Sequence, residues 1–257
     1  MFKRLVNYRD LLIVFIWREF TIKYRQTALG LLWAIFQPLS MMLLFTFIFG
    51  IVLKHKLSDY PYVLFFYSGI LPWSFFSSSV NFGINSLVNQ RSLITKIYFP
   101  REIIPISGLA VSFIDFCISF LIYVLFLKIY GIHFTKNMVW FIPLLGMLII
   151  FSMSISLLFS ALNVYYRDVK LLSSFLLQLW FFATPIFYSV DKVSMKFKLI
   201  LFLNPLTFIV ENMRRVTLEG RGVIFWQLCF ELLMISLFYI FSYRLFLTVE
   251  RKMADII

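Results

Sequence analysis

The feature that most limits the folds open to this chain is a set of six apolar runs, each long enough to cross a membrane. A helix needs about 20 apolar residues to span the roughly 30 Å hydrocarbon core of a bilayer. Of the 257 residues, 61% are hydrophobic and 14% are charged, whereas about a quarter of a soluble domain is charged. We therefore predict an all-helical membrane protein with a six-helix transmembrane domain over residues 30–247. The predicted spans are residues 30–53, 61–88, 103–127, 138–164, 169–188 and 223–247.

The basic residues predict the orientation of these spans. The net charge is +12, but the charges lie in clusters between apolar runs, which favours orientation signals and anionic-lipid contacts over nucleic-acid binding. Six spans put both termini on one side, which carries 14 Lys and Arg residues against 10 on the other. Because cytoplasmic loops are enriched in Lys and Arg, we expect both termini to be cytoplasmic.

Three segments outside the spans have their own predictions. Residues 1–29 interleave apolar and basic side chains, which predicts an amphipathic helix on the cytoplasmic leaflet. Residues 248–257 form a cytoplasmic tail. Within 189–222 the apolar part is too short to span and Asn204-Pro205 interrupts it, which predicts a re-entrant outer hairpin that turns there. A surface loop is the alternative.

Motifs of catalysis and nucleotide binding are absent from the sequence. It has no G-x-x-x-x-G-K-[ST], H-E-x-x-H or G-x-S-x-G. Cys117 and Cys229 lie inside apolar runs and have no disulfide or metal-site spacing. We expect no catalytic residues, no metal and no cofactor on this chain. If it moves a substrate with ATP, the ATPase is another chain.

Two carboxylates, Asp115 and Glu231, lie within predicted spans at matching depth, about 12 Å from the outer face at 1.5 Å per residue. No Lys or Arg lies at that depth in any span. They are therefore expected to share a proton or to bond to Ser, Tyr or Trp. A structural contact between the third and sixth spans is the favoured interpretation. A proton relay in a secondary transporter is the alternative.

Aromatic residues in the first, second and fifth spans are candidates for a sugar-binding surface. The apolar face of a pyranose can stack on such rings without forming a tight polar trap. Packing is the simpler interpretation of any single ring. The candidates are Trp33, Phe36, Tyr67, Trp73, Phe76, Trp180, Phe187 and Tyr188.

The stretch LITKIYFPREIIPIS, residues 93–107, is a charged, proline-containing segment between two apolar runs. Residues 91–102 hold four charged side chains, and inserting them would cost on the order of 10 kcal/mol at about 2.5 kcal/mol each. The segment therefore lies outside the hydrocarbon core. Pro105 fits the first turn of the next span, where a backbone N–H is not needed.

Four stretches resemble one family of membrane proteins. They are REFTIKYRQTALGLLWAIFQPL (18–39), IYFPREIIPIS (97–107), NVYYRDVK (163–170) and LNPLTFIVENMRRV (203–216). Their order and spacing resemble the permease subunits of type-2 ABC exporters of polysaccharides, such as O-antigen and teichoic acid exporters. The O-antigen permease is the most similar.

The resemblance implies a homodimer in the bacterial inner membrane that pairs with two ATPase subunits, which hold ATP and Mg. Lipid-linked polysaccharide, as in lipopolysaccharide biosynthesis, would pass through a channel between the two permease copies. The N-terminal helix would rest at the cytoplasmic interface. The segment after the second span would meet the ATPase, and the segment before the sixth span would form the outer gate.

The resemblance also assigns roles to residues. In the coupling segment 91–102, Tyr98 and Phe99 would form an apolar knob, Pro100 would end a short helix, and Arg101-Glu102 would mark the membrane boundary. The coupling residues are Lys96, Ile97, Tyr98, Phe99, Pro100, Arg101 and Glu102. A second cytoplasmic contact comprises Arg167 and Asp168. The outer-gate residues are Asn204, Pro205, Arg214 and Arg215.

Two other classes remain as alternatives. One is an enzyme acting on lipid-linked sugar, which the lack of clustered acids, bases or metal ligands disfavours. The other is a scaffold without transport. The motifs do not distinguish which glycan is carried.

Overall fold

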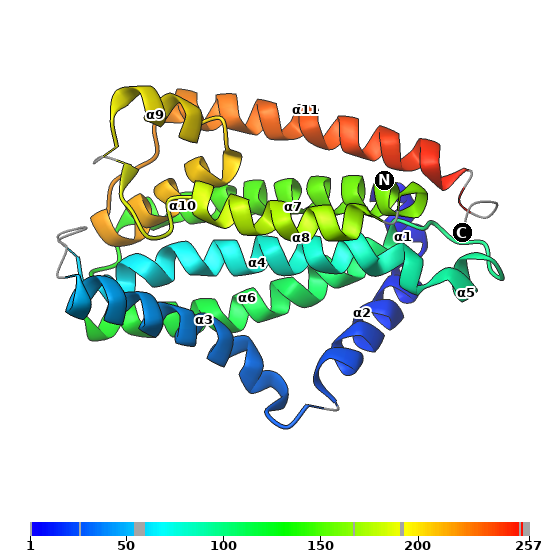
Figure 1. The fold of residues 1–257 in the computed structure, drawn as a ribbon, viewed down its shortest axis with the longest axis horizontal. Coiled ribbons are helices and arrows are strands. Elements are labelled where there is room, and N and C mark those ends of the chain that lie inside the picture. Colours follow the sequence, from blue (N-terminus) through cyan, green and yellow to red (C-terminus); the bar gives the residue numbers. More distant parts are fainter. Residues whose placement is uncertain are drawn as a thin grey trace.

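The chain folds into an elongated helical bundle, seen in a computed structural model that describes residues 2–25, 27–53, 60–166, 168–190, 193–251 and 253. These residues contain helices and no strand (Figure 1). The elements are α1 (Phe2–Asn7), α2 (Arg9–Tyr24), η1 (Gly30–Leu32), α3 (Trp33–Phe45), η2 (Thr46–Val52), α4 (Tyr62–Asn89), α5 (Arg91–Ile94), α6 (Ile103–Ile129), η3 (Lys136–Trp140), α7 (Phe141–Tyr165), α8 (Val169–Ala183), α9 (Met195–Leu201), α10 (Pro205–Arg214), η5 (Arg215–Glu219) and α11 (Phe225–Glu250).

Five helical stretches in the described part of the chain are long and apolar enough to cross a membrane. They are Gly30–Val52, Tyr62–Asn89, Ile103–Ile129, Lys136–Tyr165 and Phe225–Glu250. The remaining predicted span, residues 169–188, is helical only as far as Ala183. Its 15 residues cover about 22 Å at 1.5 Å per residue, short of the hydrocarbon core.

The early end of α8 follows from Pro185. A residue before proline is pushed out of the helical region, and Thr184 has φ −97° and ψ 136°. Its hydroxyl donates to the backbone oxygen of Trp180 at 2.9 Å. Residues 184–189 then continue without regular helix, so the sequence prediction of a helix through residue 188 is wrong at this end.

Both chain termini and α5 lie at one end of the bundle, and α9 and α10 lie at the other (Figure 1). Helix α4 runs from the α9–α10 end to the α5 end, and α6 returns beside it. The segment predicted to couple to an ATPase is therefore on the same side as both termini. The segment predicted to form an outer gate is on the opposite side.

Helix α4 is the centre of the bundle and packs between α6 and α7. In the apolar 18-residue stretch of α4, 78% of the residues are buried, whereas in the corresponding stretch of α11 22% are buried. Small residues allow the close approach. A Cβ on Gly83 of α4 would lie 1.8 Å from Ser156 Oγ of α7, and one on Gly108 of α6 would lie 1.6 Å from the ring of Phe82.

The N-terminal region differs from the predicted single amphipathic helix over residues 1–29. It forms two helices, α1 and α2, and α2 packs against α6. Trp17 is exposed, whereas the carboxylate-bearing Glu19 is buried and accepts a hydrogen bond from Gln90 Nε2 at 3.1 Å. The inward face of α2 is therefore mixed, because it buries Glu19 together with Phe15 and Tyr24.

Two short helices, α9 and α10, meet at the turn predicted at Asn204-Pro205. Asn204 caps α10 by accepting a hydrogen bond from the backbone N–H of Leu206 at 3.1 Å. Pro205 occupies the first helical position, where its missing N–H leaves no bond unmade. Helix α10 packs on both α4 and α7, so this hairpin closes one end of the bundle.

The contact at Gly83 gives a direct test of the packing. We predict that Gly83→Ala lowers stability by about 1–3 kcal/mol, because the added methyl must push α7 away. Gly146→Ala on α7 is the matched control, since nothing lies within 4 Å of its Cβ position and alanine is the better helix former. Thermal unfolding of the detergent-solubilised protein measures both. Equal midpoints for the two variants would contradict this packing.

Candidate functional site

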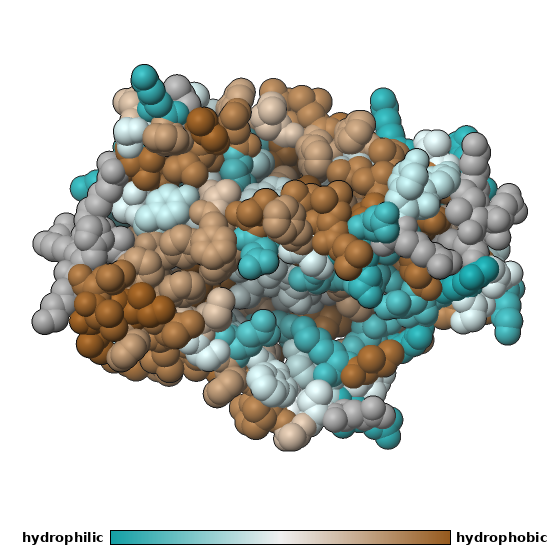
Figure 2. Space-filling model, viewed as in Figure 1, coloured by the Kyte–Doolittle hydropathy of each residue, from teal (hydrophilic) through white to brown (hydrophobic). Residues whose placement is uncertain are grey.

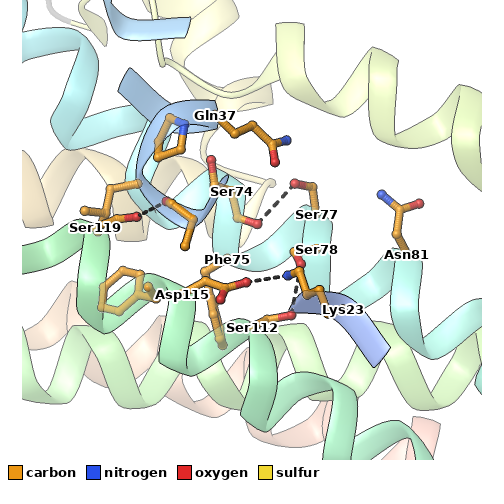
Figure 3. Close-up of a pocket in the computed structure, with 14 residues that line it drawn as sticks. Lys23, Gln37, Ser74, Phe75, Ser77, Ser78, Asn81, Ser112, Asp115 and Ser119 are labelled. Atoms are coloured by element: carbon orange, nitrogen blue, oxygen red, sulfur yellow. Dashed lines mark hydrogen bonds and ion pairs between the residues drawn. The ribbon is translucent and has the colours of Figure 1, made fainter. Parts of the chain in front are cut away.

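A polar groove of about 310 Å³ lies between α2, α3, α4 and α6. Figure 3 shows hydroxyl and amide side chains gathered there from all sides, together with one ion pair. Hydrophilic surface also crosses the middle of this face between apolar areas (Figure 2). The polar lining residues are Lys23, Gln37, Ser74, Ser77, Ser78, Asn81, Ser112, Asp115 and Ser119.

Helical spacing explains why one wall of the groove is polar. Ser74, Ser77, Ser78 and Asn81 recur three, four and seven residues apart, which places them on one face of α4. The hydroxyl of Ser78 lies 3.0 Å from that of Ser112 on α6. No Asp, Glu, Lys or Arg occurs in residues 62–89. The α4 wall is therefore polar but uncharged.

The charge in the groove is an ion pair between Lys23 of α2 and Asp115 of α6. Tyr24 donates its phenolic O–H to the other oxygen of the same carboxylate. Asp115 lies near the middle of α6, so these contacts fix the C-terminal end of α2 halfway along the bundle. The cation does not come from a span, which is why inspection of the spans alone left Asp115 without a basic partner.

Asp115 and Glu231 do not pair, so the predicted structural contact between the third and sixth spans is wrong, and the two carboxylates do not share a proton. Helix α11 packs mainly against α7, at the opposite edge of the bundle from α6 (Figure 1). Glu231 is buried in a mainly apolar pocket that includes Phe208 and Trp226. Within the described part of the chain, Glu231 makes no hydrogen bond or ion pair. The separation of the two carboxylates gives no support to a proton relay.

The eight aromatic candidates do not form one surface. Tyr67, Trp73 and Phe76 are buried within the chain, where the Tyr67 hydroxyl donates to the backbone oxygen of Ser119 at 3.1 Å. Their place in the core makes packing their role in this conformation.

The other aromatic candidates fall into two groups. Trp33 and Phe36 are exposed on α3. Phe187 packs on Phe45 and Phe181, Trp180 donates its indole N–H to Asn204 at 2.8 Å, and Tyr188 is half-buried. A sugar-facing role therefore remains a prediction, best suited to the two exposed rings of α3.

The coupling segment has a different apolar knob from the one the sequence predicted. Tyr98 is 85% exposed and Ile97 is also exposed, but Phe99 is only 5% exposed. The ring of Phe99 lies 5.7 Å from that of Phe15. Helix α5 ends at Ile94, so Pro100 does not end it. The exposed apolar side chains of the segment are therefore Ile97 and Tyr98, beside exposed Lys96.

Arg101 and Glu102 fix this segment to the rest of the protein. The fully buried carboxylate of Glu102 accepts hydrogen bonds from Arg4 Nη1 at 3.3 Å and from the Tyr243 hydroxyl at 3.4 Å. The backbone N–H of Arg101 donates to Glu250 Oε1 at 3.0 Å. Burial and the nearby Glu250 raise the pKa of the Glu102 carboxyl, and Arg4 opposes this. These contacts link the segment to α1 and α11.

The second predicted cytoplasmic contact is described only in part. Arg167 lies outside the described residues. Asp168 is exposed immediately before α8, at the connection from α7.

The outer-gate candidates centre on Arg214, which is buried at the end of α10. Its guanidinium pairs with Glu211 at 2.9 Å, donates to Ser68 Oγ of α4 at 3.2 Å and to the backbone oxygen of Pro185 at 3.0 Å. It also lies 3.8 Å from the ring centroid of Phe65. Arg214 therefore joins α10 to α4 and to the segment after α8.

Asn204 adds a second tie at this end. Besides capping α10, its side chain contacts Trp180 and donates to the hydroxyl of Thr184 at 3.2 Å. Arg215 begins η5, and its Nε is buried without a hydrogen-bond partner among the described residues.

These features define a class: a helical membrane protein with several spans, a polar groove in its side and opposite ends built from different short helices. Residues 10–218 match the ABC-2 type transporter family. The chain belongs to this family of membrane transporters.

Named relatives agree with this assignment. The chain is 32% identical over 212 residues to the O-antigen export system permease protein RfbA of Klebsiella pneumoniae, covering 82% of this chain and 81% of that protein. It is 31% identical over 221 residues to the RfbA protein of Myxococcus xanthus, covering 85% and 84%. It is 25% identical over 208 residues to the polysialic acid transport protein KpsM of Escherichia coli, covering 79% of each.

The sequence interpretation did not identify the groove. The available signal was the run SSSVN at 77–81, because serines and an asparagine at helical spacing in an otherwise apolar span indicate a polar face. Lys23 carried no such signal, because its place beside Asp115 depends on how α2 packs.

The two adjacent aromatic residues of the coupling segment should respond differently to truncation. We predict that Phe99→Ala lowers stability by about 3 kcal/mol, because it leaves a cavity beside Phe15. Tyr98→Ala should change stability by less than about 0.5 kcal/mol, because its side chain is exposed. Thermal unfolding of the solubilised protein separates the two. A larger loss for Tyr98→Ala would show that the segment packs differently.

Proposed function

We propose that this chain is the permease subunit of an ATP-driven exporter that moves lipid-linked polysaccharide, of the O-antigen kind, across the bacterial inner membrane. The observation that carries the proposal is a groove with a polar, uncharged α4 wall in a member of the ABC-2 type family. Hydroxyl and amide side chains can both donate and accept hydrogen bonds. Such a surface can exchange contacts with successive sugars as a glycan moves past.

The groove is open on one side, which favours a path completed by a second copy. In this proposal two permease copies form a homodimer, and the glycan passes between them along the two α4 faces. The names of the RfbA relatives, which refer to O-antigen export, support this substrate class.

ATP binding and hydrolysis belong to two partner ATPase subunits in this proposal. The chain has no phosphate-binding loop, so ATP and Mg are held by the partner. Ile97 and Tyr98 form the exposed contact. Because Arg101 and Glu102 bond to α1 and α11, force on this loop reaches both helices.

The proposed topology has six crossings. Helix α8 is completed by the irregular segment that follows it, and α9–α10 form a re-entrant hairpin at the outer face. The excess of basic residues on the terminal side, 14 against 10, supports cytoplasmic termini. Arg214 would hold the outer hairpin closed through Glu211, Ser68 and Pro185.

The coupling contact can be tested with matched tyrosine variants. We predict that Tyr98→Ala abolishes co-purification of the ATPase or its export-linked hydrolysis, because truncating a buried interface aromatic costs about 2 kcal/mol or more, a loss in affinity of roughly 30-fold. Tyr130→Ala, an exposed tyrosine after α6 at the opposite end, is the control. The proposal fails if the Tyr98→Ala and Tyr130→Ala variants retain the ATPase and its export-linked hydrolysis equally well.

A further inference from the structure

We infer that the α4 groove selects uncharged polysaccharides and rejects glycans that carry carboxylates. This inference rests on the proposed function and names the substrate class of the same site. It comes from a count of the charges that line the groove and of the partners those charges already have.

The groove offers neutral hydrogen-bonding groups to a substrate. Its α4 wall carries serine hydroxyls and the amide of Asn81, and Gln37 adds a second amide from α3. Asn81 is exposed, so its amide is available to a ligand. These groups match sugar hydroxyls, which donate and accept in the same way.

Lys23, the cation in the groove, already has a carboxylate partner. Lys23 pairs with Asp115, and Tyr24 donates to the second oxygen of that carboxylate. A carboxylated sugar would have to displace Asp115 from Lys23 and leave a partly buried carboxylate without its cation. Breaking such a pair is unfavourable in a site of low dielectric.

The groove's extension adds no free cation. A second hollow shares Lys23, Ser78, Asn81 and Ser112 with the groove and also includes Glu19. Glu19 accepts a hydrogen bond from Gln90, and Lys23, which is paired with Asp115, is the single cation in the described lining of both hollows. An anionic sugar would therefore meet no unpaired cation in either hollow, whereas a neutral sugar needs none.

Transport of two glycans by the same complex tests the inference. The permease and its ATPase are reconstituted in lipid vesicles with two polyprenyl-diphosphate-linked oligosaccharides of equal length. One contains neutral hexoses and the other contains sialic acid, which has a carboxylate on each residue. Both glycans carry the same lipid diphosphate, so a difference between their transport rates depends on the charge of the sugars. We expect the neutral glycan to move at least 10-fold faster.

A charge placed in the groove shows whether the groove causes the difference. Asn81→Lys should reduce the neutral-to-anionic rate ratio at least five-fold, because it supplies an unpaired cation. Ser77→Lys is a second variant with the same expected direction. Asn89→Lys is the control. It also replaces an asparagine of α4 with lysine, but at the end of the helix and outside the groove, and it should leave the rate ratio unchanged.

Each outcome decides one of the two claims. Equal rates for the two glycans, faster movement of the anionic one, or a ratio that Asn81→Lys and Ser77→Lys leave unchanged would overturn selection by the groove while leaving polysaccharide export intact. Failure to move either glycan despite ATP hydrolysis by the intact complex would overturn the proposed function itself.

Discussion

The close packing of α4 against α6 and α7 is the constraint on which the rest of the structure depends. Gly83 and Gly108 leave no room for a side chain between these helices, so one side of α4 is fixed within the protein. Its other side then remains as the groove wall, where Ser77 and Asn81 can meet a substrate. A looser bundle would let α4 rotate, and the polar stripe would lose its defined position.

Charged residues from outside the long spans attach the outlying helices to this centre. Lys23 fixes α2 to α6 through Asp115, and Arg214 fixes α10 to α4. Arg4 reaches the buried carboxylate of Glu102 at the terminal end of the bundle. In each case the two partners are far apart in sequence. Because a buried polar or charged group is costly without a partner, each contact favours one position for its segment.

The helical class, the segments rich in apolar residues and the turn at Asn204-Pro205 could be read from the sequence, because they depend on local composition and on proline. The end of α8 also had a local signal in Pro185, which excludes the helical conformation at Thr184. The inward packing of Phe99 and the pairing of Asp115 had no local signal. Both depend on which neighbouring helix lies beside them, and α2 supplies the partner in each case through Phe15 and Lys23.

The most direct test of the account is whether the glycan passes along α4 during transport. In a background with Cys117 and Cys229 replaced by serine, single cysteines are placed at Asn81 in the groove and at Leu237, which is exposed on α11. A thiol-reactive lipid-linked oligosaccharide is then supplied to the complex with its ATPase. We expect ATP-dependent crosslinking at Asn81→Cys and none above background at Leu237→Cys. Crosslinking at Leu237→Cys alone, or at both positions equally and without ATP, would contradict a path along α4.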